Sequence, residues 1–139
     1  MNSSMQKSPL NLAYILEHAA RFHQHQQVVS RMDDGNLHRY TYTEALKRAK
    51  QLANALRTAG IETGDRVATL AWNDYRHFEC WYGIVGQGAV CHTVNPRLFA
   101  AQIKYIINHA QDKIILIDLS FVDLLETIQA ELPSVHHYI

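Results

Sequence analysis

Five polar or aromatic residues that could contact a ligand stand at the ends of three short apolar runs. They are Trp72, Asn73, Asn95, Arg97 and Asp118. In an open parallel sheet, ligands bind outside the carboxyl ends of the strands, where an amide, a guanidinium or a carboxylate can bind a polar group. The simpler interpretation is that these side chains cap helices and form a salt bridge. We treat them as positions near a ligand crevice and assign no catalytic, cofactor-binding or metal-binding residue.

The histidines and cysteines show no pattern typical of a metal site. The chain has nine histidines. Three pairs come closest to ligand spacing: His23 with His25, His136 with His137, and His77 with Cys80. None of them completes a zinc ligand set, so we expect packed or solvated imidazoles. Cys80 and Cys91 have no CxxC spacing, and two reduced thiols are expected rather than a disulfide.

The glycine series Gly83, Gly86 and Gly88 has the order GxxGxG. A phosphate cradle needs glycines after a strand, directed at a helix N-terminus. Here the glycines end a predicted helix and precede a strand, so they indicate close helix packing and a tight turn. The sequence also contains no GxxxxGK[ST], GxSxG or HExxH motif.

The elements that position these residues are predicted from three apolar runs, Val67–Trp72, Ala89–Val94 and Ile114–Ile117. Segments of helical length separate the runs. Continuous apolar runs with helices between them are typical of a parallel sheet that is covered on both faces. The predicted fold class is therefore α/β, with a partial doubly wound parallel sheet.

The residues before this sheet are expected to pack on it. Asn11 is a plausible cap for a helix that continues to about Phe22. A turn at 32–36, which contains Asp-Gly, predicts a β-hairpin whose second strand is Leu37–Thr41. The fold class thus includes an N-terminal helix and a hairpin.

Helix boundaries are predicted from capping residues. Thr43 is expected to cap a helix that ends at Gly60, and Asn73 is expected to cap the next helix. A helix is also predicted over about Ala100–Ala110. Ser120 resembles the start of a capping box and would open a helix through Ala130.

Composition and charge argue against two classes of partner. The 139 residues carry thirteen Lys and Arg and thirteen Asp and Glu, which gives a formal net charge of zero. A balanced chain has no long-range field that attracts nucleic acid, so no nucleic-acid partner is expected. No apolar run approaches the roughly 20 residues that span a bilayer, so no transmembrane segment is expected. The N-terminus lacks a secretory pattern, and the expected location is cytoplasmic.

The chain is expected to be one piece of a larger protein. Residues 1–9 are polar and are expected to be disordered. Residues 10–139 are expected to form part of a domain that is truncated at its C-terminal end. A fourth strand begins at Val135–Ile139, and a sheet that stopped there would expose an unpaired apolar edge.

An ordered series of motifs runs along nearly the whole chain. It includes Tyr40–Leu46 (YTYTEAL), Gly64–Ala68 (GDRVA), Arg76–Glu79 (RHFE), Asn95–Leu98 (NPRL) and Ile106–Ala110 (IINHA). The series resembles the N-terminal part of the acyl-adenylate-forming enzymes, the AMP-dependent synthetase/ligase superfamily. Within them it is most similar to the medium- and long-chain fatty acyl-CoA synthetases.

The resemblance implies the first subdomain of the large AMP-binding domain of a fatty acid–CoA ligase, about the first quarter of the enzyme. Such an enzyme activates a carboxylic acid with ATP to acyl-AMP and then forms acyl-CoA. ATP, Mg²⁺ and CoA are implied for the full-length enzyme. The fragment is expected to bind none of them and to be inactive alone, because the family's phosphate loop, ribose-binding aspartate and C-terminal lysine have no counterpart here.

Implied partners are the remainder of the synthetase chain and, in a homodimer, a second copy. Two alternatives remain open. One is a short non-catalytic α/β module for binding or dimerisation. The other is a flavodoxin-like nucleotide-binding domain, which would need a Gly- or Ser/Thr-rich loop directly after a strand, and all three strand ends lack one.

Overall fold

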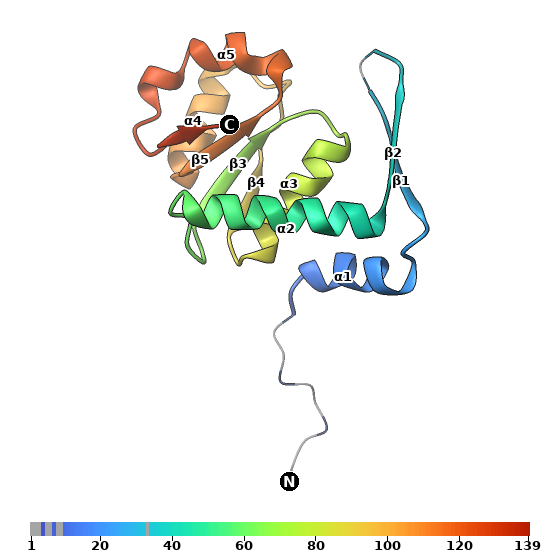
Figure 1. Ribbon diagram of the computed structural model, residues 1–139. Coiled ribbons are helices and arrows are strands. Elements are labelled where there is room, and N and C mark those ends of the chain that lie inside the picture. Colours follow the sequence, from blue (N-terminus) through green and yellow to red (C-terminus); the bar gives the residue numbers. More distant parts are fainter. Residues whose placement is uncertain (1–3, 5–6, 8–9, 33) are drawn as a thin grey trace.

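The structure is a computed structural model that describes residues 4, 7, 10–32 and 34–139 (Figure 1). The expected disorder of residues 1–9 falls mostly on residues outside this part. In chain order the elements are α1 (Ala13–Phe22), β1 (Gln27–Arg31), β2 (Leu37–Thr41), α2 (Tyr42–Thr58), β3 (Arg66–Leu70), α3 (Tyr75–Gly86), β4 (Val90–Thr93), α4 (Ala100–Ala110), β5 (Ile114–Ile117), α5 (Val122–Glu126) and β6 (His137–Tyr138). Short 3-10 turns precede and follow α5 at Leu119–Phe121 and Gln129–Glu131.

Four parallel strands form the main sheet in the order β4-β3-β5-β6. The chain enters at β3, adds β4 on one side and then crosses back to add β5 on the other. Val67 of β3 therefore pairs with Cys91 of β4 and with Ile114 of β5. This reversal in strand order is the doubly wound arrangement, and it confirms the predicted fold class.

Two apolar clusters cover the two faces of the sheet. Ala68 and Leu70 of β3 belong to a cluster that includes Ile103 and Ile107 of α4. Val67 of the same strand belongs to the opposite cluster, which contains residues of α2 and α3. Alternate residues of a strand point to opposite faces, so a strand with both faces buried needs helices on both sides.

A third cluster joins the N-terminal elements to the helices. Leu16 of α1, Tyr40 of β2, and Ala45 and Ala49 of α2 are buried together. In Figure 1 α1 lies alongside α2, and the hairpin rises from one end of α2. The hairpin pairs β1 with β2 in antiparallel register, with Val28 opposite Tyr40. The expected N-terminal helix and hairpin are therefore confirmed.

The start of α2 differs from the prediction. Thr41, not Thr43, is the cap: its Oγ1 accepts the N–H of Glu44 at 3.2 Å, and the Glu44 carboxylate accepts the N–H of Thr41 at 2.7 Å. Thr41 is the last residue with extended backbone, as a cap requires, whereas Thr43 already lies in the helix. The predicted end is confirmed, because Gly60 follows the helix with a φ of 87°.

The segment after β5 also differs from the prediction. Asp118 caps the 3-10 turn, and its Oδ1 accepts both the N–H and the hydroxyl of Ser120. Ser120 is thus a donor to a cap and does not itself open a helix. The expected continuous helix through Ala130 is a short α5 followed by a second 3-10 turn.

At Gly83 the helices α3 and α2 pack closely together. A Cβ atom at this buried position would lie 2.9 Å from Cδ2 of Leu52 and 3.0 Å from the backbone oxygen of Ala49. Ordinary side-chain contacts are longer, so any larger residue pushes the helices apart. The prediction that this glycine is a packing residue is confirmed.

We expect Gly83→Ala to lower the free energy of unfolding by about 1–3 kcal/mol, because the new methyl group overpacks the helix interface. Urea denaturation followed by circular dichroism measures the change. Gly86→Ala is the matched control, since its nearest heavy atom, Cβ of Ala13, is 3.9 Å away. That control should be neutral or more stable by about 0.5–1 kcal/mol, from helix propensity. Equal stability of Gly83→Ala and wild type would contradict the packing role.

The edge strand β4 is tied to the segment after α4 by a histidine–aspartate pair. Nδ1 of His92 lies 2.7 Å from Oδ2 of Asp112, whose side chain is fully buried. The hydrogen bond to Asp112 raises the pKa of His92 above its ordinary value, although partial burial opposes the shift. When the imidazole is protonated, its charge compensates a carboxylate that has no contact with water.

This pair predicts how stability depends on pH. Because the folded pKa of His92 is raised, its stabilisation is fully present below the unfolded pKa of about 6.5 and is lost as pH rises through the folded pKa. His92→Gln should therefore destabilise the protein more at about pH 6 than at about pH 8.5. Urea midpoints of both proteins at the two pH values measure this difference. A cost that does not change with pH would show that His92 is not charged in the pair.

Candidate functional site

The carboxyl ends of β3 and β5 lie side by side and form a small crevice of about 170 Å³. The first turn of α3 forms one wall and the residues just after β5 form another. Thr69, Asp74, Arg76, His77 and Asp118 supply its polar side chains. This is where the strand order reverses, which is the usual place for a ligand in an open α/β sheet.

Asp118 is the only one of the five sequence-predicted positions that lines this crevice among the residues described. Its N–H donates to the backbone oxygen of Leu70 at 2.9 Å, which holds the chain against the end of β3. Trp72 packs instead against Phe121, with ring centroids 4.8 Å apart. The structure thus brings Asp118 to the crevice and directs Trp72 to the apolar cluster beneath α5.

The other predicted positions lie at the same edge of the sheet but outside the crevice. Asn95 accepts the N–H of Arg97 through Oδ1 at 3.0 Å, which shapes the turn after β4. Asn73 is exposed, and its neighbour Asp74 is the cap of α3. The prediction that Asn73 caps this helix is therefore wrong. The backbone of Asp74 is extended, and its side chain reaches the N–H groups of the first turn.

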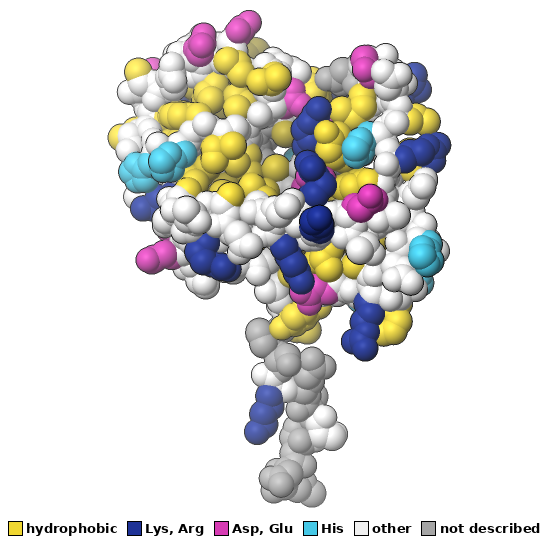
Figure 2. Space-filling model, in the orientation of Figure 1, with side chains coloured by type: hydrophobic (Ala, Val, Ile, Leu, Met, Phe, Trp, Pro, Cys, Tyr) yellow, Lys and Arg dark blue, Asp and Glu magenta, His cyan; other side chains and the backbone are white. Residues whose placement is uncertain are grey.

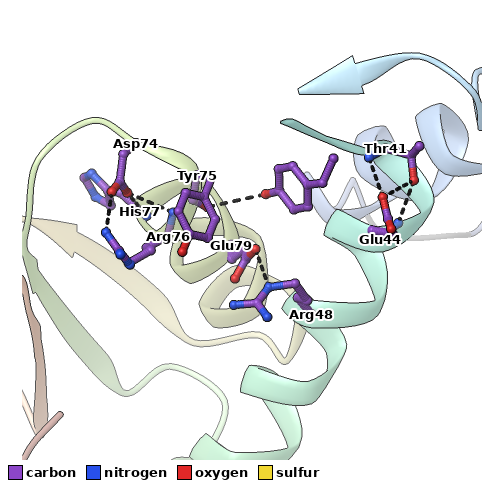
Figure 3. Close-up of polar contacts among 9 residues, drawn as sticks. Thr41, Glu44, Arg48, Asp74, Tyr75, Arg76, His77 and Glu79 are labelled. Carbon is purple, nitrogen blue, oxygen red and sulfur yellow. Dashed lines mark hydrogen bonds and ion pairs between the residues drawn. The ribbon is translucent and has the colours of Figure 1, made fainter. Parts of the chain in front are cut away.

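Asp74 organises the start of α3, as Figure 3 shows. Its Oδ1 accepts the N–H groups of Arg76 and His77 at 2.8 and 3.2 Å. Its Oδ2 forms an ion pair with Nη1 of Arg76 at 3.0 Å. The guanidinium of Arg76 also lies 4.9 Å from the ring centroid of Tyr75. One carboxylate therefore fixes both the helix end and the arginine beside it.

His77 connects this helix turn to the central strand. Its Nε2 lies 2.9 Å from Oγ1 of Thr69, a residue with no exposed surface. Burial lowers the pKa of His77 below its ordinary value, although the charge of Asp74 opposes the shift. The imidazole is therefore neutral at neutral pH. Sequence reasoning did not nominate Thr69 or Arg76, and it considered His77 only as a metal-ligand pair with Cys80, although the spacing Asp-x-Arg-His at a helix start was a visible signal.

A second, wider hollow adjoins the crevice on its outer side. It has a volume of about 420 Å³ and reaches from Asp118 and Arg76 to Met32 and Asp34 at the hairpin turn. Asp118 and Arg76 line both spaces. The carboxylate and the guanidinium at the sheet edge are thus accessible from a surface wide enough for a polar group or another polypeptide segment.

The crevice has the groups to bind but lacks an activated nucleophile. Burial raises the pKa of Cys80 to about 12, so its thiol stays protonated at neutral pH. The described residues contain no group of three or more His, Cys, Asp or Glu that could hold a metal ion. In the same part of the chain, no helix is long and apolar enough to cross a membrane.

Comparison with known proteins finds ligases that are similar in sequence to this chain. It is 46% identical to a long-chain-fatty-acid–CoA ligase of Thermus thermophilus over 99% of this chain and 25% of that protein. It is 43% identical to a medium-chain-fatty-acid–CoA ligase of Ectopseudomonas oleovorans over 100% of this chain and 26% of that protein. The chain thus spans about a quarter of the length of these relatives.

Solved structures agree with this comparison. An inhibitor-bound N-terminal domain of FACL13 from Mycobacterium tuberculosis is 26% identical with a TM-score of 0.85, over 93% of this chain and 33% of that one. The anthranilate CoA ligase AuaEII, at 24% identity and a TM-score of 0.88, shares the fold over 99% of this chain and 26% of its own. The family model described as AMP-binding enzyme matches residues 15–138. The chain therefore belongs to the family of AMP-binding enzymes.

Proposed function

We propose that the chain forms the N-terminal part of a fatty acid–CoA ligase. The observation that carries the proposal is the likeness over the whole chain to ligases named for long- and medium-chain fatty acids, at 46% and 43% identity. The N-terminal domain of FACL13 supports the position within the enzyme, since it resembles this chain with a TM-score of 0.85. Residues 10–139 would then be the first section of the AMP-binding domain.

In this proposal the complete enzyme converts a carboxylic acid and ATP to acyl-AMP and pyrophosphate, and then transfers the acyl group to CoA. ATP, Mg²⁺ and CoA are held by the remainder of the synthetase chain. Residues 10–139 supply a rigid sheet whose carboxyl edge faces that remainder. We place the enzyme in the cytoplasm, where ATP and CoA are both available.

The sheet edge is the proposed contact with the remainder of the enzyme or its ligand. Asp118 lines both hollows at this edge, and Trp72 anchors the segment after β3 against Phe121. Asn73, Asn95 and Arg97 are exposed at the same edge. We propose these five positions for proximity and assign them no catalytic role.

The 139-residue chain alone is expected to give no ATP–pyrophosphate exchange with a fatty acid, because it spans only about a quarter of the length of the ligases it matches. The assay is run with and without Mg²⁺ and beside the Thermus thermophilus ligase as positive control. A chimera in which this chain replaces the matching quarter of that ligase should recover exchange. Exchange by the isolated chain would overturn the first expectation, and an inactive but folded chimera would overturn the proposed function.

A second candidate is a non-catalytic dimerisation module. The observation that favours it is the exposed apolar face of α1, where Leu12, Ile15 and Phe22 are 49%, 57% and 61% exposed. Reading the gene downstream separates the two candidates. A phosphate loop in frame supports the ligase, whereas a stop codon together with a stable dimer in sedimentation supports the module.

A further inference from the structure

A third hollow lies on the other side of Tyr75, between the hairpin and α2. We call it the α2 groove; its volume is about 440 Å³, and its principal side chains are His38, Tyr40, Lys47, Arg48, Gln51 and Tyr75. On the face shown in Figure 2, Lys and Arg side chains form a column between two apolar areas. The function proposed above uses none of these residues.

The floor of the groove is one face of α2. Glu44, Lys47, Arg48 and Gln51 have the spacing i, i+3, i+4 and i+7, so they form a continuous stripe along the helix. The stripe holds two cations and one carboxylate. Glu44 is already committed to the helix cap, where it accepts the N–H and the hydroxyl of Thr41. Arg39 also lines the groove, and Glu79 pairs with Arg48 beneath it, so three cations stand against two carboxylates and leave a small excess of positive charge.

Arg48 is held in place from below. Its Nε donates to Oε1 of Glu79 at 2.6 Å, and the Glu79 side chain is only 9% exposed. The Arg48 side chain itself is 52% exposed, and its two terminal nitrogens point away from Glu79 in Figure 3. Those nitrogens form no hydrogen bond with any residue that the structure describes. A guanidinium that is anchored through Nε and has both terminal nitrogens free can donate two parallel hydrogen bonds to the oxygens of a phosphate or carboxylate.

The wall of the groove is a rigid set of aromatic rings. The rings of His38 and Tyr75 stack with centroids 3.7 Å apart and an angle of 19° between their planes. Tyr40 packs edge-on against Tyr75 and donates its hydroxyl to the backbone oxygen of Tyr75 at 3.4 Å. Such preformed ring surfaces favour a planar group because little conformational freedom is lost on contact.

We propose that the α2 groove binds a small aromatic phosphate ester, with the phosphate at Arg48 and Lys47 and the planar group against the ring of His38, which Tyr75 supports from behind. The volume of the groove fits one small molecule. Nucleic acid is disfavoured, because the chain has no net charge and therefore no long-range field to attract it. This site is separate from the carboxyl edge of the sheet, and the proposal does not depend on the ligase function.

The test is a titration of the 139-residue chain with phenyl phosphate and with inorganic phosphate at low salt, followed by NMR. Binding of both compounds should saturate and should change the chemical shifts of residues in α2 and β2. Phenyl phosphate should bind roughly threefold more tightly through the ring contact. Equal affinities would overturn the role of the aromatic wall. The absence of saturable binding, or tighter binding of an acidic peptide, would overturn the proposed ligand.

Charge variants test the floor of the groove. Lys47→Gln should weaken binding of both phosphates roughly two- to fivefold, as expected for an exposed charge pair. Lys50→Gln is the matched control on the same helix, because Lys50 lies outside the groove and pairs with Glu17 at 3.3 Å. Equal weakening by both variants would mean unspecific attraction and would overturn the site.

Two further variants separate binding from folding. Arg48→Lys keeps a cation for the buried Glu79 but removes the two terminal guanidinium nitrogens. The protein should therefore remain folded and bind phosphate more weakly. His38→Ala should remove the advantage of phenyl phosphate and leave the affinity for inorganic phosphate unchanged. Unchanged affinity in a folded Arg48→Lys protein would contradict the position given to the phosphate.

Discussion

The burial of Val67–Leu70 in β3 is the constraint on which the rest of the structure depends. Val67, Ala68, Thr69 and Leu70 have no exposed surface. A strand that is buried on both faces and on both edges needs a helix layer on each side and a parallel neighbour on each edge. The crossovers that supply these neighbours bring all carboxyl ends to one edge. The single hydroxyl of the strand, on Thr69, needs a partner, and His77 fulfils that need. This hydrogen bond thus ties the first turn of α3 to the central strand.

The contact between α2 and α3 fixes the position of the N-terminal elements relative to the sheet. Gly83 allows the helix backbones to approach closely, and the ion pair of Arg48 with Glu79 crosses the same interface. A buried carboxylate is stable only when its charge is compensated, so α2 cannot slide along α3 without a large cost. The same interface sets Tyr75 against Tyr40, and it thereby fixes where the hairpin stands.

Apolar patterning was enough to predict the layers of the fold, but not the helix caps or the side-chain pairs at the carboxyl edge of the sheet. The bounds of α4, Ala100–Ala110, were predicted correctly, because that helix is amphipathic and its buried Ile103 and Ile107 share one face. The caps were misplaced because two candidate residues stand close together, and tertiary structure decides where the extended backbone stops. Asp118 was found because it follows an apolar run. Thr69 and His77 were missed because their pairing depends on how α3 folds back over β3.

The first turn of α3 is shared by two surfaces of different character. Arg76 pairs with Asp74 at the crevice and lies over the ring of Tyr75, which forms the wall of the α2 groove. A group that fills the crevice and a ligand that enters the groove would therefore contact neighbouring residues of one rigid helix turn. The buried hydrogen bond of His77 to Thr69 resists displacement of this turn. The two surfaces can thus be occupied independently, unless a ligand moves Arg76 from its position between Asp74 and Tyr75.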